Sequence, residues 1–376
     1  MAKLGILGTI IPTEYGGAGL DSITYATVIE EISKHCASTG VVTSVHNSLC
    51  AGPIIYYGTE QQKKKYLPIL AKGEQIGAFA ATEPNAGSDL ASMKTTAELK
   101  GDTYIINGDK TFITSGPEAG IIIVFAVTDK NAGSKGISAF IVEKQMKGFK
   151  VGSIYEKLGI NASKTSELIF EDMHVPKENL LGKEGDGFKI ALSTLDSGRI
   201  GIAAQAVGIA QAALQESIEY SKQRQQFGRP IAKFQAIQWM IAEMATKIEA
   251  ARLLVYNACY QKDQGRMFSK EAAMAKLFAS EIAMDAVDKA VQIHGGYGYT
   301  KEYMVERLFR DAKITEIYEG TSEVQKMVID FKILPNLFVR CFKSKKVKVF
   351  VFFCSSSQYR AIWFFLFVLV CLSTTS

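Results

Sequence analysis

Residues 195–211 read LDSGRIGIAAQAVGIAQ, near the start of a segment, 187–332, whose only proline is Pro230. Residue types that favour helices, chiefly Ala, Leu, Ile, Glu and Lys, dominate this segment. Their periodicity predicts long helices over about 187–222, 234–264 and 269–293, and a shorter helix after residue 321. Helices of this length with short connections pack together. The sequence therefore predicts a helical bundle in this part of the chain.

The residues before the bundle divide into a helical part and a β-rich part. Between Thr24 and Leu70, apolar residues recur at helical spacing. From about residue 75, short β-rich runs are bounded by Gly, Asn, Asp and Ser, and such strands favour an antiparallel barrel or sandwich over a parallel sheet. We therefore predict an α+β fold. Its parts are an N-terminal helical domain at 1–74, an antiparallel β domain at 75–182 and a C-terminal helical bundle at 183–330.

The last residues, 331–376, differ in composition from everything before them. They hold 9 of the 21 Phe, none of the 32 Gly, and seven Lys or Arg without any Asp or Glu. Their longest apolar run, 361–372, is shorter than a membrane-spanning helix. We interpret 331–376 as an anomalous tail outside the fold. The alternative is a membrane-associating tail, with basic residues first and apolar residues after them.

Composition and motifs exclude several classes of function. Residues 1–330 hold 36 basic and 38 acidic side chains, a balance that argues against nucleic-acid binding. No GxGxxG follows a strand and no GxxxxGK[ST] occurs, so neither a Rossmann site nor a P-loop is expected. The four His are scattered, without HExxH or CxxC, so no metal site is expected and each His is predicted to be structural. No apolar run is long enough to predict a stable membrane span.

Two short segments in the β-rich part could bind a flat ring system. Residues 79–89 read FAATEPNAGSD, where backbone N–H groups and hydroxyls could bind the edge of a heterocycle. Residues 110–116 read KTFITSG, where a strand end presents an aromatic ring beside hydroxyls. Taken alone, each segment could equally be an ordinary turn or a surface strand.

Three segments of the bundle have spacings that suit a ligand. Asp196 and Arg199 share a helix face and can pair, with Gly198 leaving room for a ligand; a surface ion pair is the alternative. Arg224, in RQQFG and followed by Gln235, suits a phosphate or a subunit contact. The glycine pair in QIHGGYG, 292–298, either ends a helix or lets a ligand approach the backbone closely.

The segment 317–325, IYEGTSEVQ, is the most informative one. Ser322 and Gln325 have the spacing of a capping box, which predicts a helix start. Glu319 precedes that helix and adjoins Gly320, so its carboxylate is open to a ligand. Once burial tunes its pKa, a carboxylate in a cleft suits the abstraction of a proton from carbon. Glu319 is therefore a candidate base, whereas Glu323 could merely stabilise the helix N-terminus.

Together, these segments resemble the acyl-CoA dehydrogenases, most closely the short-chain (butyryl-CoA) branch. The resemblance covers about residues 4–330, in the family's order. It implies a bound FAD, a homotetramer, and dehydrogenation of a short-chain acyl-CoA to a trans-2-enoyl-CoA, in fatty-acid or branched-chain amino-acid degradation. It also implies electron-transfer flavoprotein as the electron acceptor. The implied location is the mitochondrial matrix in a eukaryote or the cytoplasm in a bacterium.

The resemblance also assigns roles to the motif residues. It makes Glu319 the catalytic base, because the base position of the long-chain and isovaleryl branches is here Gly198. The residues implied to contact the acyl-CoA are Ser88, Asp196, Ser197, Gly198, Arg199 and Gly320. The residues implied to hold the FAD, partly from a neighbouring subunit, are Phe79, Ala81, Thr82, Gly87, Ser88, Phe112, Ile113, Thr114, Arg224, Gln235, Gln292, Ile293, His294, Gly295, Gly296, Thr321, Ser322 and Glu323.

Two alternatives remain open at this point. An acyl-CoA oxidase-like enzyme would share the first half of the reaction and pass its electrons to O2. A non-catalytic, truncated helical protein is the other alternative. It is suggested because the family's helices before Leu4 are missing here, and because its terminal helix gives way to the tail after about Ile329.

Overall fold

The computed structural model describes residues 1–334, 338–343 and 348–353. Met1–Lys326 form one compact unit, and a second unit begins at Met327. Within the second unit, strands β11 (Phe338–Lys343) and β12 (Lys348–Phe353) pair antiparallel. The apolar run at 361–372 lies outside the described residues, and the interpretation of 331–376 as a tail outside the fold stays a prediction.

Helices form the first part of the Met1–Lys326 unit. They are α1 (Ser22–His35), α2 (Ala37–Ser44), the π-helical segment η4 (Val45–Ala51), α3 (Gly52–Tyr57) and α4 (Glu60–Ala71). The α1 helix begins where the Asp21 carboxylate accepts a hydrogen bond from the Thr24 N–H at 2.8 Å. The α4 helix begins with a capping box between Thr59 and Gln62.

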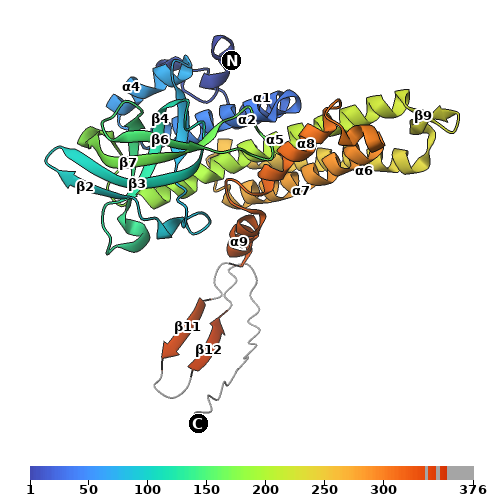
Figure 1. The fold of residues 1–376 in the computed structure, drawn as a ribbon. Coiled ribbons are helices and arrows are strands. Elements are labelled where there is room, and N and C mark those ends of the chain that lie inside the picture. Colours follow the sequence, from blue (N-terminus) through green and yellow to red (C-terminus); the bar gives the residue numbers. More distant parts are fainter. Residues whose placement is uncertain (335–337, 344–347, 354–376) are drawn as a thin grey trace. The chain divides into compact units, whose positions relative to one another are not determined.

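Eight strands follow and form one sheet (Figure 1). They are β1 (Ile76–Ala80), β2 (Thr96–Lys100), β3 (Thr103–Thr114), β4 (Ala119–Val127), β5 (Ile137–Glu143), β6 (Phe149–Ile154), β7 (Thr165–Pro176) and β8 (Leu180–Leu181). Their order is β6-β7-β3-β2-β4-β5-β8, with β1 beside β4. The sheet is mainly antiparallel, but β1 and β2 both pair parallel with β4. The expectation of a wholly antiparallel sheet was therefore wrong in this respect. A long excursion separates β1 from β4, and such a connection lets two strands run in the same direction.

The bundle consists of α5 (Gly187–Gln223), α6 (Gln235–Asp263), α7 (Ser269–His294) and α8 (Val305–Ala312), then the short η10 (Lys313–Glu316). The last helix, α9 (Ser322–Ile333), begins in this unit and ends in the second one. The three long predicted helices are confirmed to within about one residue at each end. In Figure 1, α5, α6 and α7 run side by side and extend away from the sheet. The α+β fold class, with helices, then a β domain, then a helical bundle, is confirmed.

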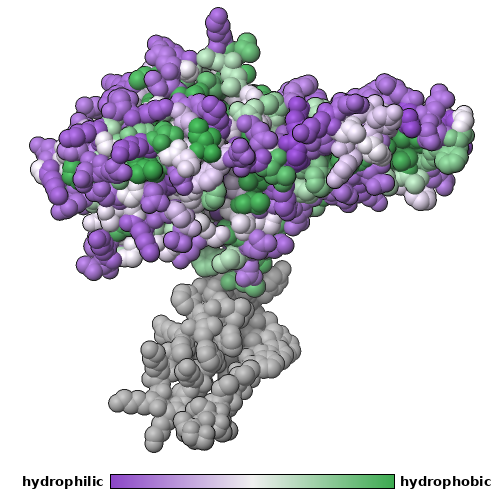
Figure 2. Space-filling model, in the orientation of Figure 1, coloured by the Kyte–Doolittle hydropathy of each residue, from purple (hydrophilic) through white to green (hydrophobic). Residues whose placement is uncertain are grey.

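Small apolar residues make the close packing of the bundle possible. Ala203, Ala204 and Ala206 on α5 are buried against α1 and α7, in a cluster that also contains Ala279 and Ala283 of α7. Alanine lets helix axes approach closely and favours the helix itself. On the face seen in Figure 2, most of the described surface is hydrophilic and the hydrophobic side chains form separate patches. The buried apolar residues therefore pack mainly in the interior of the unit.

A buried histidine joins the N-terminal helices to the sheet. His46 on η4 is fully buried, and its Nδ1 accepts a hydrogen bond from the Gly77 N–H of β1 at 3.0 Å. Its Nε2 lies 3.1 Å from the Leu70 carbonyl of α4, so Nε2 carries the proton of the neutral ring. Burial lowers the pKa of His46 to about 4. His46 therefore has the structural role that the sequence predicted.

His46 should make stability depend on pH. Between about pH 6.5 and pH 4, the unfolded chain binds a proton at this ring and the folded chain does not. The contribution of the neutral ring is present above pH 6.5 and is lost as pH falls, by about 3 kcal/mol in total. His46→Gln should lower the thermal unfolding midpoint at pH 7, and the two midpoints should converge as pH falls towards 4.5. The exposed His174→Gln is the control, and parallel curves for wild type and His46→Gln would contradict this role.

Candidate active site

Glu319 lies in a turn between η10 and α9 whose backbone is left-handed. The φ angles are 52° at Glu319 and 94° at Gly320, and such an angle is uncommon for a residue with a side chain. The Gln325 Nε2 donates to the carbonyls of Glu319, at 3.2 Å, and Gly320, at 2.8 Å. The preceding Tyr318 hydroxyl donates to Gln205 of α5. The turn is therefore fixed on both sides of the candidate base.

The start of α9 differs in one detail from the prediction. The helix begins at Ser322 as expected, but the cap is Thr321, whose Oγ1 accepts from the Val324 N–H at 3.4 Å. The predicted capping box of Ser322 and Gln325 does not form, because the Gln325 amide is taken up by the two carbonyls of the turn. Gln325 therefore supports the turn that carries Glu319 instead of capping the helix.

The carboxylate of Glu319 is buried, and neither oxygen has a hydrogen-bond partner within the described part of the chain. It faces α5 at Gly198, where a Cβ atom would collide with the Glu319 Oε2. Burial raises the pKa of Glu319 to about 8, and the positive charges of Arg199 and Lys276 oppose that rise. The site therefore holds an acid–base group that titrates near neutral pH.

Arg199 and Asp196 form a buried ion pair beside Gly198. Arg199 Nη1 donates to Asp196 Oδ1 at 2.5 Å, and only 4% of Arg199 is exposed. The Ser269 hydroxyl of α7 donates to the second oxygen of Asp196. The alternative of an exposed surface pair is therefore wrong, and Arg199 is fixed next to Glu319.

A groove of about 400 Å³ adjoins Asp196. Its other lining residues were not predicted from the sequence. They come from a loop of the β domain, from Gly185 just before α5, and from the start of α5. They are Ser134, Lys135, Gly185, Phe188, Lys189, Leu192 and Ser193. No motif joins them, because they meet only when the sheet packs against α5.

The two β-domain segments predicted to line a ring system lie side by side. The Thr111 N–H donates to the Thr82 carbonyl at 2.9 Å, which joins the segment 79–88 to the end of β3. At that end, Phe112 has a φ of 57° and is 63% exposed, with its ring centroid 4.9 Å from that of Tyr155. Gly87 and Ser88 are exposed on the loop, Phe79 and Thr114 are half-buried, and Ala81 and Ile113 are buried. The structure therefore offers an exposed aromatic ring beside accessible loop backbone.

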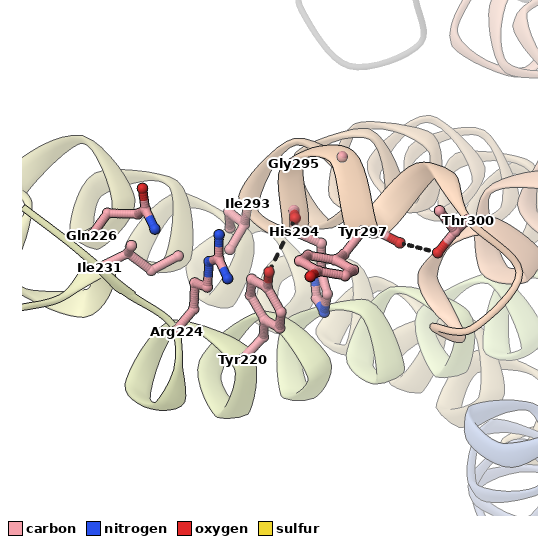
Figure 3. Close-up of a pocket in the computed structure, with 10 residues that line it drawn as sticks. Tyr220, Arg224, Gln226, Ile231, Ile293, His294, Gly295, Tyr297 and Thr300 are labelled. Carbon is pink, nitrogen blue, oxygen red and sulfur yellow. Dashed lines mark hydrogen bonds between the residues drawn. The ribbon is translucent and has the colours of Figure 1, made fainter.

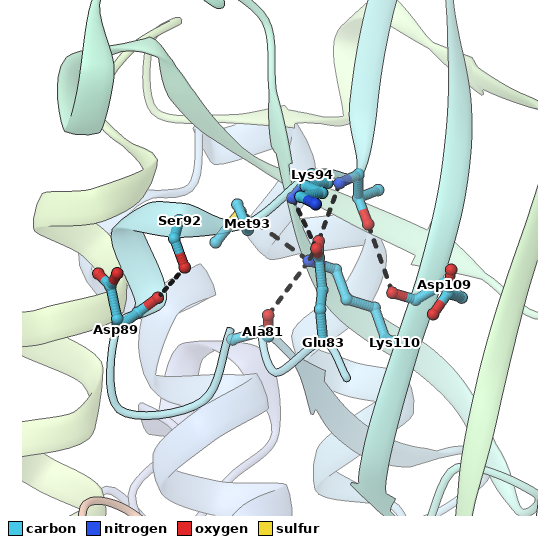
Figure 4. Close-up of polar contacts among 9 residues, drawn as sticks. Ala81, Glu83, Asp89, Ser92, Met93, Lys94, Asp109 and Lys110 are labelled. Carbon is cyan, nitrogen blue, oxygen red and sulfur yellow. Dashed lines mark hydrogen bonds and ion pairs between the residues drawn. The ribbon is translucent and has the colours of Figure 1, made fainter. Parts of the chain in front are cut away.

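A buried ion pair supports that loop (Figure 4). Lys110 Nζ donates to Glu83 Oε1 at 2.8 Å and to the Ala81 carbonyl at 3.1 Å. The Glu83 carboxylate also accepts from the N–H groups of Lys94 and Thr95. Burial lowers the pKa of Lys110 to about 8, against the charge of Glu83. The sequence contains both residues within the motifs, but only the fold reveals their pairing.

A second pocket, of about 500 Å³, lies where the end of α5 meets the end of α7 (Figure 3). Five predicted residues line it: Arg224, Ile293, His294, Gly295 and Gly296. Five further residues line it, none of which was assigned to a site from the sequence, although Gln226 and Tyr297 belong to the two motifs: Tyr220, Gln226, Ile231, Tyr297 and Thr300. Tyr220 stacks on His294 at 4.1 Å, and the Arg224 guanidinium lies 5.4 Å from the centre of the Tyr297 ring. The pocket thus combines aromatic rings, a cation and accessible glycine backbone.

The predicted residues do not all meet within one chain. Arg224 follows Gly198 by 26 residues, which places it about 39 Å farther along a continuous helix path. Gln235 is exposed at the start of α6, and Gln292 is exposed on α7 next to the pocket residues. Ser197 is buried on α5 and Glu323 is exposed at the start of α9. The chain therefore has a Glu319 site and a separate Arg224 pocket.

The described residues offer neither a metal cluster nor a membrane-spanning helix. No group of three or more His, Cys, Asp or Glu there is placed to hold a metal ion. None of the helices described has both the length and the apolar character needed to cross a membrane.

Comparisons with known proteins identify the family. Three family models match: the acyl-CoA dehydrogenase N-terminal domain at residues 1–74, the middle domain at 78–173 and the C-terminal domain at 185–334. A short-chain specific acyl-CoA dehydrogenase from Clostridium acetobutylicum is 58% identical over 333 residues, which are 89% of this chain and 88% of the relative.

Solved structures support the same family assignment. Butyryl-CoA dehydrogenase from Megasphaera elsdenii matches with a TM-score of 0.88 and 52% identity, over 89% of this chain and 88% of that one. A chain from a structure described as the electron transferring flavoprotein of Acidaminococcus fermentans matches with a TM-score of 0.89 and 57% identity, over 89% and 88%. The chain therefore belongs to the acyl-CoA dehydrogenase family of FAD-dependent oxidoreductases that act on CH–CH bonds.

Proposed function

We propose that the chain oxidises a short-chain acyl-CoA to the trans-2-enoyl-CoA and passes the electrons to electron-transfer flavoprotein. The observation that carries this proposal is the buried Glu319 carboxylate, which has no partner among the described residues and faces Gly198. The names of the similar proteins, short-chain specific and butyryl-CoA dehydrogenase, support the substrate class. The similar chain from the electron transferring flavoprotein structure supports the acceptor.

Glu319 has the properties that removal of an α-proton requires. A thioester α-proton is weakly acidic, so a base with a raised pKa matches it better than an ordinary carboxylate does. Burial supplies that rise, to about 8, and leaves both oxygens free of other hydrogen bonds. The charges of Arg199 and Lys276 keep part of the carboxylate ionised near neutral pH. Gly198 provides the space that the carboxylate occupies.

The residues present fit an FAD. The exposed Phe112 ring and the loop at 81–88 suit a flavin ring, which supplies the hydride acceptor when the cofactor is bound. Gly295 and Gly296 have open space at their Cβ positions, and the buried Nε2 of His294 has no partner among the described residues. Arg224 beside these glycines suits a diphosphate. Drawn from two neighbouring subunits, these groups would hold the two ends of one cofactor, together with the start of α9 at Thr321, Ser322 and Glu323.

The separation along α5 supports an assembly of at least two subunits, and we keep the homotetramer that the family resemblance implies. A span of about 39 Å exceeds the reach of one extended FAD, so the Arg224 pocket and the Glu319 site of one chain serve different cofactors. The Arg224 pocket would thus complete the site of a neighbouring subunit. For location we keep the sequence-based proposal: the cytoplasm in a bacterium or the mitochondrial matrix in a eukaryote.

The first test replaces the proposed base. Glu319→Gln keeps the size and polarity of the side chain but cannot accept the proton. The variant should retain FAD and bind butyryl-CoA, yet reduce its flavin at least ~10² times more slowly than wild type. Stopped-flow bleaching of the flavin measures this rate.

The matched control is the exposed Glu302→Gln, which should bleach at the wild-type rate. Near-normal bleaching in Glu319→Gln would show that another residue is the base.

Reoxidation of the wild-type flavin is measured in the same samples. Rapid peroxide formation with O2, in place of electron-transfer flavoprotein reduction, would favour the oxidase alternative.

A second test concerns the Arg224 pocket. Arg224→Ala removes the cation beside Tyr297 and should lower the FAD content per chain, because a diphosphate loses its partner. Flavin absorbance and sedimentation measure cofactor content and assembly. Arg229→Ala, an exposed position outside the pocket, should leave both unchanged. If Arg224→Ala keeps the full FAD content and the wild-type mass of the assembly, Arg224 does not bind the cofactor.

A further inference from the structure

Lys276 is a fully buried lysine on α7 that the sequence motifs do not single out. Its Nζ donates to the Gly320 carbonyl at 2.8 Å. The Gln325 Nε2 of α9 donates to the same carbonyl, also at 2.8 Å. Two helices therefore hold one carbonyl, and it belongs to the residue directly after Glu319. We call Lys276, Gln325 and the Gly320 carbonyl the Gly320 clamp.

The clamp acts on the part of the backbone that aims the Glu319 side chain. Glu319 and Gly320 are both left-handed, with φ of 52° and 94°. For a residue with a side chain, this conformation persists only where the surroundings hold it. The direction of the Glu319 carboxylate towards Gly198 depends on that backbone. Loss of the clamp would let the turn relax and the carboxylate move.

A neutral donor would be enough to satisfy the Gly320 carbonyl, and Gln325 already provides one. Burying an ammonium group is costly unless a negative charge compensates it. Within the described chain, no carboxylate makes an ion pair with Lys276, and Glu319 is the acid that influences it most. The positive charge of Lys276 is therefore best explained by the neighbouring, unpartnered carboxylate.

We propose that Lys276 is a positioning residue for the reaction: it holds the Glu319–Gly320 turn, and its ammonium charge favours the ionised form of Glu319. This inference rests on the proposed role of Glu319 as the base. Lys276 contacts the Gly320 carbonyl and not the Glu319 carboxylate, so it acts through the backbone and through its charge.

Other charged and titratable groups surround this pair. The positive charge of Arg199 from α5 lowers the pKa values of both Lys276 and Glu319. The carboxylates of Glu316 from η10 and Glu323 from α9 raise the pKa of Lys276. Tyr25 from α1 and Tyr318 lie close enough for Glu319 to raise their pKa values. Burial lowers the pKa of Lys276 to about 8, while Glu319 raises it. Arg199 remains in any Lys276 variant. Loss of Lys276 should therefore shift the titration midpoint of Glu319 and not abolish its titration.

The test uses two variants of the FAD-loaded protein. Lys276→Met removes both the charge and the donor, whereas Lys276→Gln removes the charge and keeps an N–H donor. In both, the midpoint of the pH profile of flavin reduction by butyryl-CoA should rise by about one unit or more, since a nearby positive charge is lost. At pH 7 the rate should fall at least ~10-fold, and further in Lys276→Met because the turn also loses a donor.

A second readout does not depend on turnover. Infrared difference spectra separate the protonated carboxyl group from the carboxylate, and the band that disappears in Glu319→Gln belongs to Glu319. Its titration midpoint in the substrate-free protein should rise in both Lys276 variants. Lys270→Met, on the same helix and paired with Glu271, is the control and should leave both midpoints unchanged.

The outcomes separate this inference from the proposed function. If Glu319→Gln is inactive and both Lys276 variants keep the wild-type midpoint, the inference is overturned and Glu319 remains the base. A slower rate at every pH without any shift also overturns it, since a purely structural lysine would behave that way. Bleaching by Glu319→Gln would instead overturn the proposed function. If Lys276→Met does not bind FAD, Lys276→Gln decides by the same two measurements.

Discussion

Burial of the Glu319 carboxylate is the constraint on which the rest of the site depends. An ionisable group without hydrogen bonds is costly to keep in the interior, and the cost appears as a pKa raised to about 8. Two cations, Arg199 and Lys276, limit that rise. Gly198 is needed because any side chain there would occupy the place of the carboxylate. The burial that destabilises the ionised carboxylate also raises its pKa, and a base of higher pKa is better suited to remove a proton from a weakly acidic C–H group.

The α5 helix links this constraint to the rest of the fold. It carries Gly198 and Arg199 in its first half and leads to Arg224 directly after its last residue, so one rigid helix holds the base and the Arg224 pocket apart. The sheet contributes a separate surface around Phe112, supported by the buried pair of Lys110 and Glu83. This arrangement explains why the proposed cofactor site draws on residues far apart in the sequence and on a second subunit.

Local patterns in the sequence were sufficient for much of this description. Helical periodicity and the absence of proline predicted α5, α6 and α7, and the three-residue spacing of Asp196 and Arg199 predicted their pairing. Two motifs and the family resemblance they carry predicted five lining residues of the pocket: QIHGG gave Ile293, His294, Gly295 and Gly296, and RQQFG gave Arg224. Each of these features depends on residues close together in the chain, or on a motif with a known spacing.

Features that depend on distant contacts were missed. The parallel pairing of β1 and β2 with β4 follows from the path of the chain between them, which strand patterns do not encode. Thr321 caps α9 because Gln325 is drawn to the Glu319 turn, a competition that no local motif reveals. Lys276 lies 44 residues before Gly320, and its sequence context is that of an ordinary helix. Tertiary contacts decided the strand pairing and the place of Lys276, and a competition among neighbouring residues decided the cap of α9.

The pH dependence of flavin reduction in the wild-type protein tests the central claim most directly. Because the base must be ionised, the rate of bleaching by butyryl-CoA should rise with pH through a midpoint near 8, where the buried Glu319 titrates. The measurement is a stopped-flow series at saturating substrate. A rate that is constant across this range, or a midpoint near the ordinary glutamate value of 4.5, would contradict the account, because the base would then not be a buried carboxylate of raised pKa.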